Sequence, residues 1–565
     1  MKNVLCNLLK DYLTEVNIDE IENLLEIPPK NELGDYSFPC FSLAKKLRKS
    51  PNIIAEGLKQ DLEKSLDKTL IEKVDTAGGY LNFFINKEYY INKVLNDALD
   101  DDYGKSNIGT GKTICIDYSS PNIAKNFHVG HLRTTIIGNS LYKIYSKQGY
   151  NVVRINHLGD WGTQFGKLIL AYKNWSSKEL VEKDGIAELL RIYIMFHDEA
   201  ERNPNLMEEA RAWFVKMESK DKEALELWKW FYDISIIEFD RIYKLLDVDF
   251  DYYTGESFYI DKLQAVVCEL EEKNLLVQSQ GAKIVDLDKY CMPPCLITKS
   301  DGSSIYAVRD IATILYRKNT FDFDKCIYVT GMEQMLYFSQ VFKVIELMGY
   351  GFYNNLIHIS YGLVNLEGAK LSTRSGNIVY AEDILNEAIK RASLTIKEKN
   401  LSLVDKEEVA KSVGVGAIIF NDLINTMIKS VDFTWDRVLN YNGATGPYVQ
   451  YTCARAKSIL RKSNIKIDDI NFNAKNLKDA SSYELIKLIS QYPDVINESA
   501  NKYEPHFIAR FALLLSQTFN KFYHECSIIN ADDEVKNSRL ILTYITQKII
   551  SDAMNLLGIK CPEEM

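Results

Sequence analysis

The central part of the chain alternates short apolar runs with longer stretches of helical periodicity. Residues 113–118 form an apolar run, and apolar positions between 136 and 145 recur at helical spacing until Gly149. A second apolar run follows at 152–156. Strand, helix and strand in this order are typical of a parallel sheet, so we expect a doubly wound, Rossmann-like domain. Further strands that continue the α/β alternation are expected at 283–287, 326–329 and 356–359.

The flanking regions have different patterns. Residues 1–110 combine helical periodicity with one extended run at 80–85, which predicts a small α+β domain. Charged helix formers fill about 173–252, and from about 384 onward the pattern is nearly all helical. We therefore expect a multidomain α/β protein with four parts: an N-terminal domain over 1–110, an α/β domain over 111–385 with a helical insertion at about 173–290, a helical connector over 386–440, and an all-α domain over 441–565.

Composition narrows the class of protein. At 565 residues, with 46% hydrophobic and 26% charged residues, the chain is typical of a folded protein of several domains. The net charge of -10 argues against indiscriminate coating of nucleic acid, which needs an excess of Lys and Arg. Ten scattered cysteines suit free thiols in a reducing compartment, and the single close pair, Cys291 and Cys295, lacks the second cluster that a structural zinc site needs. Without a signal-peptide core or an apolar run of about 20 residues, we expect a cytoplasmic protein that does not contact membranes.

Two histidines lie three residues apart at a predicted helix start. His128 and His131 flank Gly130, and Lys125 precedes them. Free backbone N–H groups at a helix N-terminus favour a phosphate, and a glycine lets a nucleotide approach closely. Taken alone, this pattern could also arise by chance in a turn, so the surrounding residues decide between the two interpretations.

Those residues resemble a known family. Arginyl-tRNA synthetases have a signature to which the string at 117–133, DYSSPNIAKNFHVGHLR, is similar, and a second hallmark of the family resembles RINHLGDWGTQFG at 154–166. The resemblance implies a class I enzyme that attaches L-arginine to its tRNA through an arginyl-adenylate, using ATP with Mg²⁺ and requiring bound tRNA for activation. Similar segments lie at 34–39, 78–83, 331–334, 370–374 and 448–451, so the resemblance covers essentially the whole chain.

The same resemblance implies the substrate-binding residues. A guanidinium matches a carboxylate in bidentate fashion, which suits Asp117 and Asp310, with the hydroxyl of Tyr306 as a third acceptor. For Asp310 the alternative is a helix cap or an ion pair with Arg309 or Arg317. Residues expected at ATP are His128, Gly130, His131, Glu333, Lys370 and Ser372, and those expected at arginine are Asp117, Ser120, Pro121, Asn122, His131, Tyr306, Asp310 and Gln334, with Asn122 and Gln334 at its α-amino end.

The segment at 370–374 resembles the mobile loop of class I enzymes that closes over the ATP phosphates. Its second lysine is absent, because Thr373 stands there and Arg374 follows. We expect Lys125 to supply the missing charge beside Lys370 and Arg374. The alternative is that Lys125 is a solvated surface lysine.

The C-terminal region carries aromatic and basic residues along one helical pattern. Such residues can stack on and clamp unpaired bases, although most aromatic residues in a helix belong to a core. The resemblance favours an anticodon-binding domain here and a monomeric enzyme. Residues expected at the tRNA are Asn82, Phe83, Tyr448, Gln450, Tyr451, Arg455 and Arg461.

Two other functions fit part of this pattern. Another nucleotidyl-transfer enzyme with the same histidine motif would share the nucleotide site, but such proteins lack the set formed by Asp117, Tyr306 and Asp310. A catalytically silent tRNA-binding relative would keep the tRNA-binding flanks, and the departure at Thr373 keeps this alternative open. Intact His128 and His131 favour an active enzyme.

Overall fold

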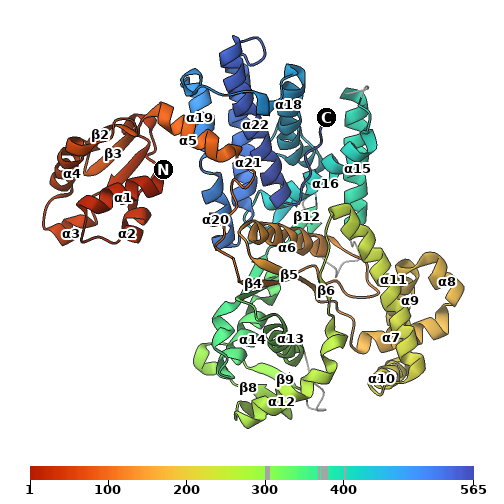
Figure 1. The fold of residues 1–565 in the computed structure, drawn as a ribbon. Coiled ribbons are helices and arrows are strands. Elements are labelled where there is room, and N and C mark those ends of the chain that lie inside the picture. The colour runs from red at the N-terminus through yellow and green to blue at the C-terminus, as the bar shows by residue number, and fades with distance from the viewer. Residues whose placement is uncertain (300–305, 367–368, 371–379, 400–402) are drawn as a thin grey trace. The chain divides into compact units, whose positions relative to one another are not determined.

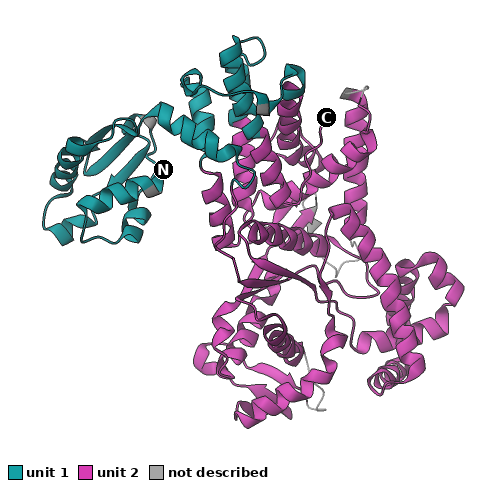
Figure 2. Ribbon diagram, in the orientation of Figure 1, with its two compact units in different colours: residues 1–103, 460–490, 518–546 teal, residues 104–459, 491–517, 547–565 magenta. Residues whose placement is uncertain are grey.

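The computed structural model describes residues 1–565 with the exception of 300–305, 367–368, 371–379 and 400–402. Its internal contacts divide the chain into two compact units (Figure 2). Unit 1 contains residues 1–103, 460–490 and 518–546, and unit 2 contains residues 104–459, 491–517 and 547–565.

Unit 1 is built on an antiparallel sheet of order β1-β3-β2, formed by β1 (Tyr36–Pro39), β2 (Ile71–Ala77) and β3 (Tyr80–Ile85). Gly78 and Gly79 join β2 to β3 with φ angles of 57° and 85°, which a hairpin of this kind requires. The extended run predicted at 80–85 and the small α+β arrangement are thereby confirmed. The helices of unit 1 include α1 (Lys2–Tyr12), α2 (Ile18–Leu24), α3 (Leu43–Leu47), α4 (Pro51–Ser65), α5 (Lys87–Leu99) and α19 (Ala480–Ile489).

Unit 2 contains a five-stranded parallel sheet of order β11-β10-β4-β5-β6. Helix α6 (Val129–Lys147) lies against one face of this sheet, and α13 (Tyr306–Phe321) and α14 (Met335–Leu347) lie against the other (Figure 1). Because both faces are covered, residues 114–116 of β4 are all buried. The strands predicted around 113, 152, 326 and 356 are confirmed as β4 (Thr113–Asp117), β5 (Asn151–Asn156), β10 (Lys325–Gly331) and β11 (Leu356–Tyr361), and β6 (Tyr252–Tyr253) completes the sheet.

The strand predicted at 283–287 exists, but it does not continue the parallel sheet. It is β8 (Ala282–Val285), which pairs antiparallel with β7 (Leu276–Ser279) and β9 (Cys295–Thr298). The expected place of this strand was therefore wrong. Periodicity indicates that a strand is present, whereas its partners depend on the turns that connect it to its neighbours.

The part of the predicted helical insertion up to Leu246 is helical, whereas the rest of the segment 173–290 also contains β6, β7 and β8. The helical character of the region after residue 384 is confirmed, and one strand, β14 (Val431–Phe433), interrupts it there. That strand forms a small sheet with β12 (Val364–Leu366) and β13 (Ala369–Lys370). The remaining helices are α7 (Thr163–Trp175), α8 (Lys178–Asp184), α9 (Ile186–Arg202), α10 (Asn205–Glu218), α11 (Lys222–Leu246), α12 (Leu263–Glu272), α15 (Ala381–Lys399), α16 (Lys406–Leu423), α17 (Trp435–Val438), α18 (Gly446–Ser463), α20 (Tyr492–Lys502), α21 (His506–Glu525) and α22 (Asp533–Leu556).

One buried guanidinium fixes α6 to two distant turns of unit 2. Nη1 of Arg133 donates to the backbone carbonyl groups of residues 362–363, and Nη2 donates to those of Met427 and Lys429. Nε lies 3.0 Å from a carboxylate oxygen of Asp422. The two Nη atoms thus donate to four backbone carbonyl groups, whereas Nε–H lies beside the Asp422 carboxylate as an ion-pair contact without a hydrogen bond.

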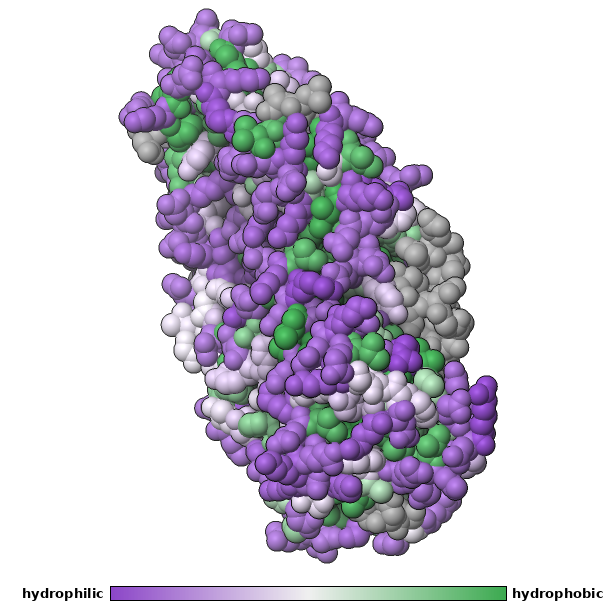
Figure 3. All heavy atoms as spheres, turned by 90° about the vertical axis from the view of Figure 1, so that its right-hand side faces the viewer, coloured by the Kyte–Doolittle hydropathy of each residue, from purple (hydrophilic) through white to green (hydrophobic). Residues whose placement is uncertain are grey.

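Hydrophilic residues predominate on the face drawn in Figure 3, and apolar residues occur there as scattered patches. Scattered apolar side chains are normal on a folded surface. Within the described part of the chain, we find no helix with the length and apolar character needed to cross a bilayer.

Candidate functional site

His128 and His131 cap the first turn of α6. Nδ1 of His128 accepts from the backbone N–H of Gly130 at 3.0 Å, and Nδ1 of His131 accepts from the backbone N–H of His128 at 3.3 Å. The two rings stack with 3.7 Å between their centroids. Because each Nδ1 is an acceptor, each neutral ring carries its proton on Nε2, which remains as a donor for a ligand. A Cβ at residue 130 would lie 2.9 Å from the His128 ring, so glycine is required there.

The electrostatic environment keeps both imidazoles neutral. Burial lowers the pKa of His128 and lowers that of His131 well below its usual value, and the nearby charge of Lys125 acts in the same direction. Lys125 is itself half-buried, its pKa is lowered by burial, and it has no ion-pair partner among the described residues. Two imidazole donors and an unpaired lysine at a helix N-terminus make this place suitable for an anion.

The loop between β4 and α6 has an unusual backbone. Ser119, Ser120 and Ala124 have φ angles of 71°, 46° and 56°, in the left-handed region that L-residues rarely adopt. Oδ1 of Asn156 accepts from the backbone N–H of Ser120 at 3.2 Å, and Oγ of Ser235 accepts from that of Ala124 at 2.9 Å. These bonds offset the strain and hold the loop in one conformation.

Asn122 lies directly against Gly159, so the segments 117–133 and 154–166, which both resemble the family, are joined to each other in the structure. The two residues make a parallel β-bridge, and the carbonyl of the buried Pro121 accepts from the N–H of Gly159 at 3.1 Å. A Cβ at residue 159 would lie 2.2 Å from Oδ1 of Asn122. The position of the Asn122 side chain therefore depends on glycine at 159.

Asp117, the last residue of β4, is engaged on both carboxylate oxygens. Oδ2 lies 2.7 Å from Nη2 of Arg317, whose side chain is fully buried, and Oδ1 accepts from Oγ of Ser120 at 2.8 Å. The Arg317 guanidinium also lies 5.3 Å from the centroid of the Tyr328 ring. The carboxylate expected to bind substrate is thus already paired with a guanidinium of the chain itself.

Asp310, in the second turn of α13, has a different environment. Its carboxylate accepts from the hydroxyl of Tyr337, and among the described residues neither Arg309 nor Arg317 pairs with it. Arg309 instead pairs with Glu256 at 2.8 Å. Among the described residues, the two arginines considered as ion-pair partners of Asp310 thus pair with other carboxylates. Burial and then the facing charge of Asp117 raise the pKa of Asp310 to about 6.

Three other candidates for substrate binding are exposed. Tyr306 opens α13 and is 65% exposed, while Glu333 and Gln334 lie in the 3₁₀ turn η4 (Met332–Gln334) that follows β10. Strands β4 and β10 are parallel neighbours, so this turn and Asp117 lie at the same carboxyl edge of the sheet. Ligands of doubly wound sheets bind at that edge.

The loop candidates are described only in part. Lys370 ends β13, whose backbone pairs with Asn365 of β12. Ser372 and Arg374, together with Thr373, lie outside the described residues. The chain after this segment returns to the nucleotide loop, because Tyr380 forms a β-bridge with His128.

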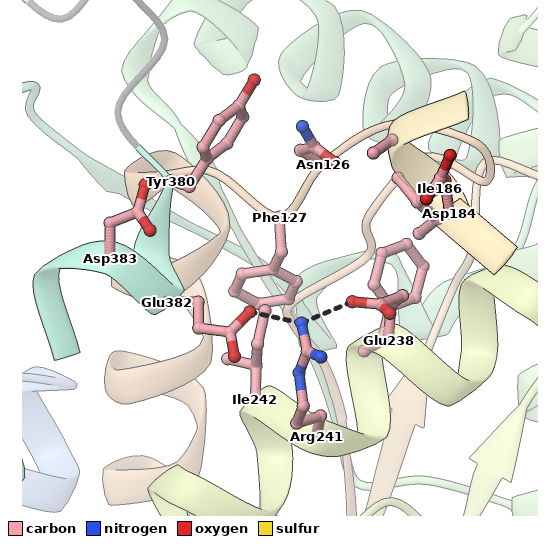
Figure 4. A pocket seen from close by; sticks show the side chains of 12 residues that line it. Asn126, Phe127, Asp184, Ile186, Glu238, Arg241, Ile242, Tyr380, Glu382 and Asp383 are labelled. Atoms are coloured by element: carbon pink, nitrogen blue, oxygen red, sulfur yellow. Dashed lines mark hydrogen bonds and ion pairs between the residues drawn. The ribbon is translucent and has the colours of Figure 1, made fainter. Parts of the chain in front are cut away.

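A cavity of about 320 Å³ lies beside that contact (Figure 4). Arg241 of α11 pairs there with Glu238 at 2.7 Å and with Glu382 of α15 at 2.5 Å, as the dashed lines in Figure 4 indicate. Asp184 and Asp383 add two further carboxylates to the lining. The ion pairs tie the first turn of α15 to α11, and sequence patterns did not reveal this pocket because its residues come from four separated segments.

The candidates for tRNA contact fall into two groups. Asn82 and Phe83 are 3% and 0% exposed, and Oδ1 of Asn82 accepts from Oγ of Ser37 at 2.6 Å. Gln450 is also buried, and its side-chain amide donates to the carbonyl of Ser412 at 3.1 Å. We assign these three side chains to packing. Tyr448 is half-buried, Arg461 is exposed, and Tyr451 is exposed on α18 with the guanidinium of Arg455 4.9 Å from its ring centroid.

Sequence patterns missed Tyr337 and Glu256, which shape the acidic site, and considered Arg317 only as a partner of Asp310 and not of Asp117. For Arg317 a signal was present, since it follows Asp310 by seven residues, or two helical turns, and so lies on the same helix face. Tyr337 and Glu256 come from other elements, and no spacing in the sequence links them to Asp310.

Three family models match successive parts of the chain. Residues 3–85 match "Arginyl tRNA synthetase N terminal domain", residues 93–435 match "tRNA synthetases class I (R), catalytic domain", and residues 449–565 match "DALR anticodon binding domain". Together these matches extend over most of the sequence.

Similar proteins cover the chain from end to end. An arginine–tRNA ligase of Alkaliphilus metalliredigens is 52% identical over all of this chain and 99% of its own length, and one of Clostridioides difficile is 50% identical with the same coverage. The solved arginyl-tRNA synthetase of Thermus thermophilus has a TM-score of 0.84 at 26% identity, covering all of both chains. That of Plasmodium falciparum has a TM-score of 0.82 at 26% identity, covering all of this chain and 98% of its own.

Proposed function

The chain belongs to the class I arginyl-tRNA synthetases, and on that premise we propose how its residues carry out the reaction. The enzyme attaches L-arginine to its tRNA at the expense of ATP, by way of an arginyl-adenylate, and releases AMP and pyrophosphate. The arginine carboxylate is ionised at neutral pH, so its attack on the α-phosphate needs no general base. Positioning and charge stabilisation must therefore supply most of the catalysis.

ATP binds at the start of α6 in this proposal. The Nε2–H groups of His128 and His131 donate to phosphate oxygens, Gly130 permits close approach, and Lys125 provides the cation that Thr373 does not. Lys125 suits that role because it is half-buried and has no acidic partner among the described residues. Lys370, Ser372, Arg374 and Glu333 complete the expected nucleotide contacts from the segments after β13 and β10.

Mg²⁺ enters with ATP as part of the substrate. Its preferred ligands are phosphate oxygens, water and one or two carboxylates. The described residues contain no group of three or more His, Cys, Asp or Glu side chains placed to hold a metal ion. We therefore propose that phosphate and water oxygens provide most of the coordination.

Arginine binds at the carboxyl edge of the sheet, and the observation that carries this proposal is the half-buried carboxylate of Asp310. The carboxylate of Asp310 accepts a hydrogen bond from the neutral hydroxyl of Tyr337, and among the described residues it has no cationic partner. A guanidinium supplies that partner, while a lysine would leave part of the acceptor set empty. Asn122 and Gln334 bind the α-amino end, with Tyr306 and the loop residues Ser120 and Pro121 around the substrate.

Transfer RNA contacts two parts of the chain. We place the anticodon on residues 441–565, where the exposed ring of Tyr451 with Arg455 beside it forms a stacking surface, joined by Tyr448 and Arg461. The N-terminal domain, residues 1–110, contacts the tRNA elbow. The connector at 386–440 links the catalytic domain, 111–385, to the anticodon domain.

We further propose that the enzyme is a monomer in the cytoplasm. All ten cysteines are free thiols in the structure, which suits a reducing compartment. The proposal for oligomeric state rests on the family and is tested by light scattering.

Aminoacylation and pyrophosphate exchange with each amino acid, with and without tRNA, test this function. We expect arginine alone to be transferred, and we expect exchange only when tRNA is present. Charging of another amino acid would contradict the proposed arginine site, and adenylate formed without any tRNA would contradict the proposed requirement for it.

A further inference from the structure

The proposed arginine site contains a guanidinium of its own. Arg317 is fully buried at the end of α13, and its Nη2 lies 2.7 Å from Oδ2 of Asp117. Oδ1 of Asp117 accepts from Oγ of Ser120. Both oxygens of this carboxylate are thus in use before any substrate arrives, which is unusual for a group whose task is to bind a cation.

Three carboxylates lie in this region, and they differ in their partners. Asp117 pairs with Arg317, Glu256 pairs with Arg309, and Asp310 accepts from the hydroxyl of Tyr337. Of the three, Asp310 alone has no cationic partner in the described part of the chain. Other titratable or charged groups that face this set are His157, Asp160, Tyr259, Cys295 and Tyr328.

We propose that Arg317 is a positioning residue that determines how many carboxylates of the arginine site are free to pair with the substrate guanidinium. By pairing with Asp117 at the end of β4, it leaves Asp310 as the single open carboxylate for the substrate side chain among these three described carboxylates. The inference rests on the proposed arginine site and deepens it, because it removes Asp117 from direct substrate contact. Arg317 does not touch the substrate and acts through the carboxylate that it neutralises.

Loss of the Arg317 guanidinium should change the pH dependence of arginine binding. Without Arg317, Asp117 would lose its cationic partner and keep only the hydroxyl of Ser120. The charge of Asp117 already raises the pKa of Asp310, and two neighbouring carboxylates without a cation retain a proton because both cannot ionise freely. Arginine would then have to displace that proton in order to bind. The pH below which arginine affinity falls should therefore move upward.

The test compares Arg317→Met with the double variant Asp117→Asn/Arg317→Met. For each, the KM for arginine and the KM for ATP are measured in tRNA-dependent aminoacylation between pH 5 and pH 8. In Arg317→Met we expect the acid limb of the arginine profile to move upward by about one pH unit or more, with the ATP profile unchanged. In the double variant, where Asp310 is again the one carboxylate of this pair that can ionise, we expect the limb to return to the wild-type position.

The outcomes separate positioning from simple packing. If Arg317→Met folds and its acid limb stays at the wild-type pH, the pair is only a structural tie and the proposal is wrong. If Arg317→Met does not fold, the double variant decides, because replacing both members of a buried pair is tolerated far better than removing one. We expect its arginine KM at pH 7.5 to remain within about threefold of wild type, a difference of well under 1.4 kcal/mol.

A rise of tenfold or more in the double variant would mean that Asp117 contacts the substrate itself, which overturns the inference. Arg317→Lys is a matched control, since it keeps the charge and should keep the wild-type limb. Failure of the proposed function looks different, because the unmodified enzyme would then show no arginine-dependent charging at all.

Discussion

Acidification should weaken arginine binding through one carboxylate. Burial raises the pKa of Asp310 to about 6, so the group is charged above that pH and neutral below it. Only the charged form pairs with a guanidinium, and the guanidinium itself stays protonated throughout. With a pKa of about 6, the charged fraction is roughly 90% at pH 7 and roughly 9% at pH 5, so the affinity for arginine should fall about tenfold.

The same shift has the opposite effect on the empty enzyme. A carboxyl whose folded-state pKa is raised favours the folded state at low pH, and this contribution is lost as the pH rises through about 6. Bound arginine should reverse the trend, because it stabilises the ionised form of Asp310. Thermal unfolding with and without arginine, measured at several pH values, reports this reversal.

Equilibrium binding and the KM for arginine, measured from pH 5 to pH 8, provide the assay. The KM for ATP is the internal control, since burial keeps the pKa values of His128 and His131 below the usual value and no limb near 6.5 is expected from them. Asp310→Asn should bind arginine weakly at every pH. An arginine profile that is flat between pH 5 and pH 7 in the unmodified enzyme would refute the assignment.

Four further predictions concern other parts of the chain. Lys125→Ala should slow adenylate formation about 100-fold in single-turnover assays, because it removes the unpaired cation beside the phosphates, and an unchanged rate would contradict its role. Gly138→Ala should destabilise the fold by about 3 kcal/mol, since the new Cβ would lie 2.1 Å from Cγ of Tyr118. Gly57→Ala in α4, where no atom lies within 4 Å, should instead stabilise by about 0.5–1 kcal/mol in the same unfolding experiment. Tyr451→Ala should raise the KM for tRNA about tenfold and leave the KM for ATP unchanged.

Patterns within a short segment predicted the local structure around the nucleotide site well. The alternation between residues 113 and 156 gave the strand, helix and strand that place His128 and His131 at a helix start. The sequence could not reveal that Nδ1 of each histidine would cap the helix, because this depends on side-chain geometry.

Long-range pairing could not be predicted in the same way. Asp117 and Arg317 are 200 residues apart, and only the packing of α13 on the sheet brings them together. Burial of Asn82, Phe83 and Gln450 likewise depends on contacts with other segments, since an amphipathic pattern does not specify which face another segment will cover.

The buried guanidinium of Arg133, which binds four backbone carbonyl groups, affects how genetic data on this enzyme should be interpreted. Lysine at this position would offer three donors from a single nitrogen to four carbonyl acceptors that lie in two separate turns, so buried carbonyl groups would lose their partners. A library of all substitutions at residue 133 should therefore return arginine alone. This helix also begins at the nucleotide histidines, so intolerance to substitution along it will not by itself distinguish residues that touch ATP from residues that hold the scaffold.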